Sequence, residues 1–154
     1  MRRKEREITE PVLIEEIISK ADVCRIAMAN DNIPYIVTMN FGYFSGPEPR
    51  LYFHCANEGR KLKMILKNNF VCFEMDTDHE IFKGLNGCDW GMKFRSIIGT
   101  GNISIVTENE EKKTGLDSIM KHYGGDHEFT YDEKIFGRTT VLRLEIKEMT
   151  GKKR

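Results

Sequence analysis

Two basic residues, Arg60 and Lys61, follow a polar corner at residues 56–59 and open a segment whose apolar residues recur at helical spacing. The first turn of a helix carries unpaired backbone N–H groups and a partial positive charge, so it attracts anions. Helices usually place Asp or Glu there, and two cations in that turn are unfavourable unless an anion binds. The pattern therefore predicts a phosphate-binding corner. A solvated helix whose basic side chains point into water is the alternative.

The elements around this corner are predicted to be mainly strands. A strand at residues 51–55 leads into the corner, and an antiparallel pair at 22–29 and 34–43 precedes it, joined by the turn residues 30–32. Thr38 and Asn40 fall on one face of the second of these strands, which is otherwise rich in β-branched and aromatic residues. That placement indicates either a polar pocket wall or a solvent-facing edge.

The remaining pattern predicts further helices and strands. Helices are expected at residues 11–20, 60–67 and about 110–122, and strands at 70–75, 92–107 and 138–148. Residues 76–90 are predicted to be irregular, with Trp90 either stacking over a pocket or closing a loop. A mobile polar segment is expected to follow the glycine pair at 124–125 and to run to Gly137. Gly99 and Gly101 indicate a bend, a bulge or close approach by another backbone or a ligand.

These elements predict an α+β fold in which about six mostly antiparallel strands form a barrel-like sheet with flanking helices. With 154 residues the chain is expected to be one domain, 1–154, with flexible tails at 1–7 and 150–154. It lacks a GxGxxG motif and the strand–helix alternation of a doubly wound sheet. A Rossmann cofactor site is therefore not expected.

The composition and the spacing of Cys and His residues limit the kinds of ligand and partner that we expect. The 24 basic and 24 acidic residues give zero formal charge, which argues against a protein that binds nucleic acid by neutralising phosphates. The chain shows neither an apolar run able to span a bilayer nor a signal-peptide pattern, so we expect a cytoplasmic protein without membrane partners. Its four cysteines lack CxxC spacing and its four histidines lack metal-ligand spacing, which predicts free thiols and no metal site.

Several segments, taken together and in order, resemble a known family. They are MRRKEREIT, CRIAM, PYIVTMNFGY, LYFHCANEGRKL, FRSIIGTG and RLEIKEMTGK, and they span nearly the whole chain. The combination of PYxVxxNFGY, LYFHxAxxGRK and RSIIGxG is similar to the split β-barrel flavoproteins related to pyridoxamine 5′-phosphate oxidase, and most of all to their nitroimidazole-resistance (Nim) branch. The resemblance implies an FMN-binding split barrel that forms a homodimer, with two cofactor sites shared across the subunit interface.

The resemblance also implies roles for particular residues. The flavin phosphate is expected on Arg60 and Lys61, the site that the charge pattern indicates independently. The isoalloxazine ring is expected along the backbone of the second strand, and the ribityl chain beside the end of the third strand. The other subunit is expected to contribute an Arg-Ser-Ile run. The further cofactor-binding residues implied are Val37, Thr38, Met39, Asn40, His54, Cys55, Arg95, Ser96 and Ile97.

His54 carries two interpretations. It either lies next to the flavin and donates a proton to a reduced substrate, or it is packed inside the barrel with both nitrogens satisfied. Cys55 has no visible activating base and is interpreted as a packing residue. The oxidase carries basic residues where this chain has Tyr35 and Asn40. Pyridoxamine phosphate oxidation is therefore not expected, whereas FMN binding is.

The expected activity is an FMN-dependent oxidoreductase that passes electrons from reduced nicotinamide to a small organic or nitroaromatic acceptor. A non-catalytic flavin- or haem-binding module for sequestration or sensing is a second hypothesis. A dimerisation domain without a cofactor is a third. Binding of FMN with turnover, binding without turnover, and no binding distinguish the three.

Overall fold

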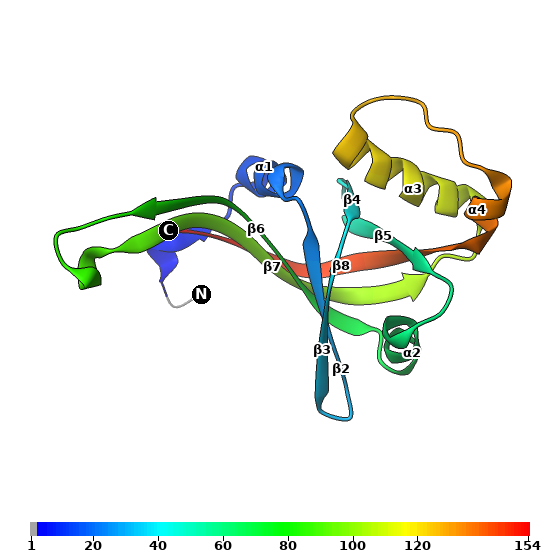
Figure 1. Ribbon diagram of the computed structural model, residues 1–154, viewed down its shortest axis with the longest axis horizontal. Coiled ribbons are helices and arrows are strands. Elements are labelled where there is room, and N and C mark those ends of the chain that lie inside the picture. The colour runs from blue at the N-terminus through cyan, green and yellow to red at the C-terminus, as the bar shows by residue number, and fades with distance from the viewer. Residues whose placement is uncertain (1–2) are drawn as a thin grey trace.

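The computed structural model describes residues 3–154, whose elements are drawn in Figure 1. The strands are β1 (Glu7–Ile8), β2 (Cys24–Asn30), β3 (Ile33–Met39), β4 (Phe41–Phe44), β5 (Arg50–Ala56), β6 (Phe70–Phe82), β7 (Gly91–Ile105) and β8 (Thr139–Lys153). The helices are α1 (Pro11–Lys20), α2 (Arg60–Lys67), α3 (Asn109–Gly124) and α4 (Glu133–Arg138), with two short 3-10 turns at Lys4–Arg6 and Gly87–Asp89.

All eight strands form one antiparallel sheet in the order β3-β2-β6-β7-β8-β5-β4, and β1 adds to β8 beside this path. The two end strands, β3 and β4, each pair with one neighbour, so the sheet curls without closing. This arrangement confirms the predicted α+β class and the split-barrel sheet. The strand number is eight rather than about six, partly because one predicted strand is divided in two.

That division falls at Asn40. The prediction of one continuous strand over residues 34–43 is wrong, because β3 ends at Met39 and β4 begins at Phe41 at the opposite end of the sheet. The short step between them crosses the opening of the split barrel. The segment that borders the opening therefore contains Thr38 and Asn40, the polar residues that the sequence analysis identifies on this strand.

Aromatic and aliphatic side chains fill the inside of the curled sheet. Phe41, Phe53 and Phe73 are fully buried there, and α1 covers them with Ile17 and Ile18, which lie on one helical face. A second cluster lies between the sheet and α3 and contains Tyr52, Val106, Leu116, Ile119 and Val141. Burial of this apolar area holds the helices against the sheet.

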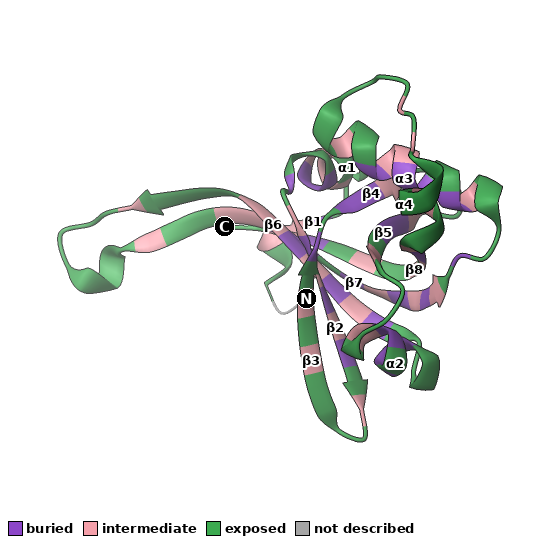
Figure 2. Cartoon of the chain, turned by 45° about the vertical axis from the view of Figure 1, so that its right-hand side comes forward, coloured by how far each residue is buried: buried purple, intermediate pink, exposed green. Residues whose placement is uncertain are grey.

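The ends of β6 and β7 form a hairpin arm that projects from the body of the protein (Figure 1) and is exposed along most of its length (Figure 2). The prediction that residues 76–90 are irregular is wrong for 76–82, since β6 continues through Phe82 and pairs with β7. It is confirmed for 83–90, which form the loop of the hairpin and contain only the short 3-10 turn. A break in the register between Thr77 and Glu80 bends the arm, and Asp78 there has a φ of 58°. Both faces of this part of β6 are exposed, so its sequence lacks the alternation of apolar and polar residues that predicts a strand.

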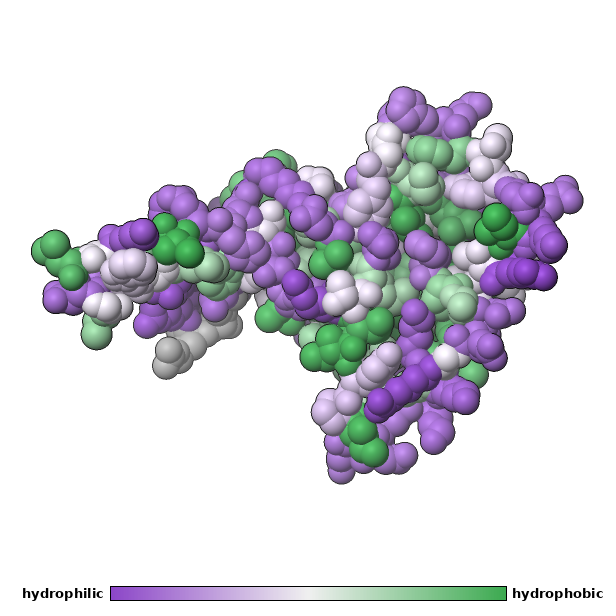
Figure 3. All heavy atoms as spheres, in the orientation of Figure 1, coloured by the Kyte–Doolittle hydropathy of each residue, from purple (hydrophilic) through white to green (hydrophobic). Residues whose placement is uncertain are grey.

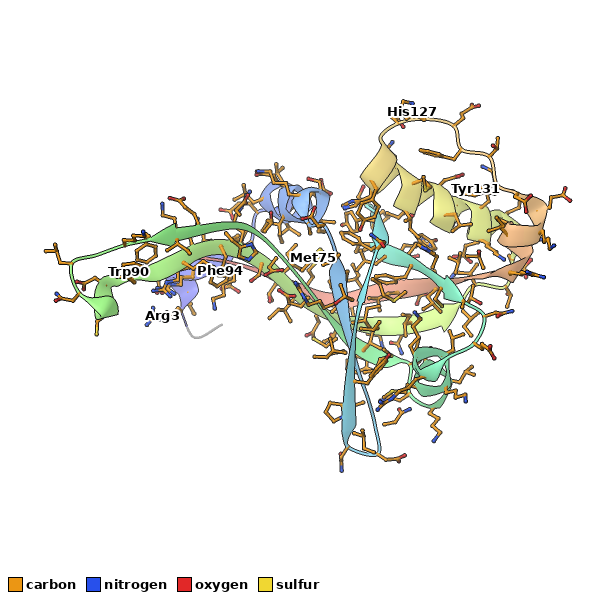
Figure 4. All side chains as sticks on the ribbon, in the orientation of Figure 1. Arg3, Met75, Trp90, Phe94, His127 and Tyr131 are labelled. Atoms are coloured by element: carbon orange, nitrogen blue, oxygen red, sulfur yellow. The ribbon has the colours of Figure 1, made fainter. Side chains whose placement is uncertain are left out.

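At the end of the arm the indole N–H of Trp90 donates to the backbone oxygen of Gly84 at 3.1 Å. Figure 4 shows Trp90 at this end of the arm, beyond Phe94. Trp90 therefore closes the loop, which is one of the two roles that the sequence left open for it.

The C-terminal residues 150–154 do not form the flexible tail that the sequence predicts. β8 continues through Lys153, and Gly151 pairs with Ile97 on one side and Ile8 on the other. Of the predicted tail at 1–7, residues 1–2 lie outside the described residues, and residue 7 already belongs to β1. Segment 125–137 is likewise more structured than expected, because it contains most of α4.

The two mid-strand glycines of β7 admit close approach by β8. A Cβ on Gly99 would lie 2.5 Å from the backbone oxygen of Glu148, and one on Gly101 would lie 2.1 Å from that of Glu145. The β7–β8 register shifts between Thr100 and Gly101. A bulge and close backbone contact thus account for both glycines.

No helix within residues 3–154 has the length and apolar character needed to cross a membrane.

Candidate functional site

The cationic corner lies where β5 passes into α2, and Gly59 sets its shape. Gly59 has a φ of 139°, a region that residues with a side chain rarely adopt, and the space where a Cβ would stand is open. The first turn of α2 has no side-chain cap and no acidic residue. Its backbone N–H groups, Arg60 and Lys61 can therefore all interact with an anion that approaches past Gly59.

The inner face and the C-terminal end of α2 hold the helix in place. Leu62, Met64 and Ile65 are buried, whereas Leu66 is 75% exposed. Asn30 on β2 donates from Nδ2 to the backbone oxygen of Met64 at 3.1 Å. The side-chain amide of Asn68, just after α2, donates to Ala29 at 2.9 Å. The β2–β3 hairpin and α2 are thus joined, which fixes the corner relative to β3.

The two cations of the corner have different surroundings. The Arg60 guanidinium stacks over the ring of Tyr35 on β3, with 4.6 Å between its central carbon and the ring centroid. Lys61 is half-buried and lies close enough to Cys55 to affect its ionisation. Burial raises the pKa of the Cys55 thiol, and the charge of Lys61 opposes that rise. Cys55 is consequently a neutral, half-buried thiol, which agrees with its interpretation as a packing residue.

The predicted residues of β3 lie along the border of the opening. Val37 is half-buried and Met39 is buried, both on the side that packs against the core. Thr38 and Asn40 are exposed, as the solvent-facing interpretation predicts. Within the described chain β3 pairs only with β2, so its other edge presents backbone groups that a ligand can contact.

His54 lies on β5 in register with Val141, and its side chain is exposed. The interpretation of a histidine packed inside the barrel is therefore wrong. Neighbouring residues of a strand point to opposite faces, so His54 lies on the face of Tyr52 and α3, whereas Cys55 packs on the face of the main core.

Arg95, Ser96 and Ile97 lie elsewhere, at the base of the arm beside α1. Arg95 forms ion pairs with Glu16 at 2.9 Å and with Asp78. Hydrogen bonds from Arg95, which has the larger effect, and from Lys20 lower the pKa of the Glu16 carboxyl group to about 2. Ser96 and Ile97 are buried, and β7 pairs on both sides at this point.

Figure 1 places α2 and the base of the arm in separate parts of the molecule. One chain therefore brings together the residues predicted around Arg60 but not those predicted around Arg95. A joint site requires a second subunit, so the role of the Arg95 group stays a prediction. The contact of Tyr35 with Arg60 was missed by sequence reasoning, although Tyr35 shares the strand face of Val37.

A hollow of about 900 Å³ lies at another place, between α1, β4, α3 and residues 126–130. Charged groups on its walls pair with each other, with Lys113 2.7 Å from Asp117 and Lys121 3.1 Å from Asp126. These pairs neutralise both lysines of the hollow and leave Glu15 and Glu128 on its walls unpaired among the described residues, so the hollow does not favour an anion such as a phosphate. Nowhere in residues 3–154 do three or more His, Cys, Asp or Glu side chains gather as a metal site would require.

An open antiparallel sheet with a cationic helix N-terminus at its opening defines an α+β protein of the split-barrel flavoprotein class. The profile of the pyridoxamine 5′-phosphate oxidase family matches residues 13–153, nearly the entire chain. The chain belongs to this family.

Solved structures share the fold. A protein of Bacteroides thetaiotaomicron assigned to 5-nitroimidazole antibiotic resistance is 33% identical, with a TM-score of 0.82 over 95% of this chain and 85% of that chain. The flavocytochrome Anf3 of Azotobacter vinelandii is 16% identical, with a TM-score of 0.82 over 100% and 72%. A FAD- and haem-binding protein of Mycobacterium smegmatis is 12% identical, with a TM-score of 0.81 over 96% and 73%. The last two show similarity of fold alone. Among curated proteins no match was found.

Proposed function

We propose that this protein is an FMN-dependent oxidoreductase that passes electrons from reduced nicotinamide to a small organic acceptor, including nitroaromatic compounds. The uncapped first turn of α2 carries the proposal, because Arg60 and Lys61 stand there with no acidic residue in the turn. The terminal phosphate of FMN is a dianion suited to this corner. When bound, the flavin supplies the electron-accepting chemistry.

The remaining residues of the opening fit the rest of FMN. In the proposed complex the free edge of β3, from Val37 to Asn40, lies along the isoalloxazine ring and contacts it through backbone groups. His54 and Cys55 lie beside the ribityl chain. His54 is exposed and can donate a proton to a substrate next to the ring.

The proposal that nitroaromatic compounds serve as acceptors rests on the similarity of this chain to one protein. The Bacteroides protein assigned to 5-nitroimidazole resistance is 33% identical over most of both chains. A small acceptor also agrees with the open border of the sheet, where the polar residues Thr38 and Asn40 are exposed.

We further propose a homodimer with two shared cofactor sites. The chain exposes 10,001 Å², whereas a compact monomer of this mass exposes about 8,000 Å². Figure 3 shows hydrophobic patches both on the body and on the arm. Large apolar side chains are exposed on the sheet at Ile36 and Ile98 and on the arm at Ile81 and Leu85. Contact with a second subunit would cover such surfaces.

A titration tests the phosphate corner. Charge-assisted hydrogen bonds are each worth about 1.5–3 kcal/mol, so Arg60→Ala with Lys61→Ala should weaken FMN binding by roughly 3 kcal/mol or more, about 100-fold. Lys63→Ala with Lys67→Ala removes the same charge from exposed positions of the same helix and should change the affinity little. Unchanged affinity in the first double variant would remove the corner from the site.

A second step separates the enzyme from a non-catalytic flavin- or haem-binding module. That alternative is favoured by the similar fold of proteins described as a flavocytochrome and as a FAD- and haem-binding protein. Excess reduced nicotinamide should bleach protein-bound FMN under anaerobic conditions, and a nitroaromatic compound should restore the colour repeatedly. Flavin that stays oxidised would contradict nicotinamide-driven turnover and favour the module.

A further inference from the structure

We propose that Tyr35 is a positioning residue for the phosphate of a bound flavin nucleotide, because its ring holds the Arg60 guanidinium in place without occupying its hydrogen-bond donors. This inference rests on the proposed function and deepens it. It assigns to Tyr35 part of the preference for a phosphorylated flavin over a flavin that lacks phosphate.

The Tyr35 ring is itself fixed in place. Tyr35 lies on β3 in register with the buried residue Met28, and its half-buried side chain packs against the main core. The guanidinium of Arg60 lies 4.6 Å from the ring centroid, within the range of a cation–π contact. An exposed arginine in water samples many rotamers, and stacking on a fixed ring reduces that freedom before a ligand arrives.

Three other arginines of the chain are held by carboxylates, whereas Arg50 and Arg154, like Arg60, lie over aromatic rings. Arg25 lies 2.9 Å from Glu74, Arg95 lies 2.9 Å from Glu16, and Arg143 lies 2.8 Å from Glu111. Each carboxylate orients its arginine but also neutralises it and accepts from its N–H groups.

Arg60 differs in both respects. Among the described residues no carboxylate oxygen lies within 4.0 Å of its guanidinium nitrogens. An aromatic face attracts a guanidinium through its quadrupole and leaves the edge N–H donors free. A stacked guanidinium can therefore present two parallel donors to a phosphate, which is the geometry of bidentate recognition.

The contact also joins the two borders of the sheet opening. Tyr35 belongs to β3 at one end of the strand order, and Arg60 follows β5, which lies near the other end. Hydrogen bonds from Asn30 and Asn68 attach the C-terminal half of α2 to the β2–β3 hairpin, and the stacked pair attaches its N-terminal turn. The direction in which Arg60 points is thus set by β3, along whose edge the flavin ring is proposed to lie.

The experiment compares FMN with riboflavin, the same flavin without phosphate, by titration of the full-length protein. A cation–π contact at an exposed site is worth about 0.5–1 kcal/mol, so Tyr35→Leu should weaken FMN binding roughly two- to fivefold. Binding of riboflavin should not change. Tyr35→Phe keeps the ring and should bind FMN as the wild type does. In an Arg60→Ala background, Tyr35→Leu should have no further effect.

Each contrary result has a distinct meaning. Equal losses for FMN and riboflavin would show that Tyr35 only supports the shape of the site, and full FMN affinity in Tyr35→Leu would show that the ring does not position Arg60. Additive effects with Arg60→Ala would also overturn the inference. If wild-type protein binds FMN no better than riboflavin and Arg60→Ala changes nothing, the proposed function itself fails. Should Tyr35→Leu unfold, Tyr35→Met, which is unbranched and fills irregular gaps, gives the same comparison.

Discussion

Replacing Gly42 by alanine should separate α3 from the sheet and destabilise the protein. Gly42 belongs to the NFGY segment and lies in β4 directly under α3. A Cβ at this position would lie 2.3 Å from Oγ of Ser118, 2.4 Å from its backbone carbon and 2.5 Å from the backbone nitrogen of Ile119. Non-bonded heavy atoms normally stand about 3.5–4.0 Å apart, so the helix backbone would have to retreat by about 1 Å.

The magnitude follows from strain and from lost hydrogen bonds. Overpacking of a close contact typically costs about 1–3 kcal/mol. The retreat of α3 would also weaken two bonds of Tyr123, which accepts from the Phe41 backbone N–H at 3.2 Å and donates to the backbone oxygen of Asp22 at 2.8 Å. At about 1 kcal/mol for each such bond, the total loss is about 3–5 kcal/mol. For a domain of this size that corresponds to a fall in melting temperature of roughly 6–20 °C.

Gly137→Ala is the matched control, because it makes the same chemical change where there is room. Gly137 lies in α4, and no atom lies within 4 Å of the position of an added Cβ. Alanine is favoured over glycine in helices by about 0.5–1 kcal/mol, so this variant should melt slightly above the wild type. Calorimetry and urea unfolding, at one protein concentration, measure both. A Gly42→Ala protein as stable as Gly137→Ala would refute the packing argument.

Three further predictions concern pH, assembly and chemistry. Because the pKa of Glu16 is lowered to about 2 from its ordinary 4.5 by Arg95 and Lys20, its ion pairs should stabilise the fold above pH 4.5 and lose this effect as the pH falls toward 2. Glu16→Gln should show a smaller decrease in the urea midpoint over that interval, and an identical decrease would exclude the pair. Sedimentation should show a dimer, and a monomer with full FMN affinity would contradict shared sites. His54→Gln should retain FMN binding but lose turnover if the imidazole donates a proton, whereas full turnover would exclude that role.

Local chemistry was sufficient to predict the parts of the fold that are specified locally. Asp31 and Asn32 both adopt positive φ, as a tight hairpin turn requires, and the sequence cluster at 30–32 indicates that turn. The helix beginning at Arg60 was also predictable from spacing. The break at Asn40 was not, because both halves of the segment favour β structure. Only the pairing of each half with a distant strand decides where the chain crosses the opening.

The arm illustrates a second limit. Sequence patterns reveal strands through one buried face, and residues 76–82 bury neither face well. Their strand structure comes from backbone pairing with β7 and from contacts such as Lys93 with Glu80 at 3.2 Å. Such pairing is set by distant residues rather than by local propensity. The charged residues of this segment, with Gly84 and Gly87 close by, therefore predicted a loop where the chain forms a hairpin.

For the site, the sequence identifies cations but not their partners. Arg60 and Arg95 were equivalent candidates, each in a segment resembling flavoproteins. In the structure Arg60 stacks on a ring and keeps its charge available, whereas Arg95 is bound to Glu16 and Asp78. Contact between Arg95 and a cofactor in a second subunit would therefore use the Nη1 donors, because Asp78 and Glu16 accept from Nε and Nη2. The two carboxylates also offset the charge of Arg95, so with both ion pairs intact Arg95 would attract an anionic ligand less strongly than Arg60 does.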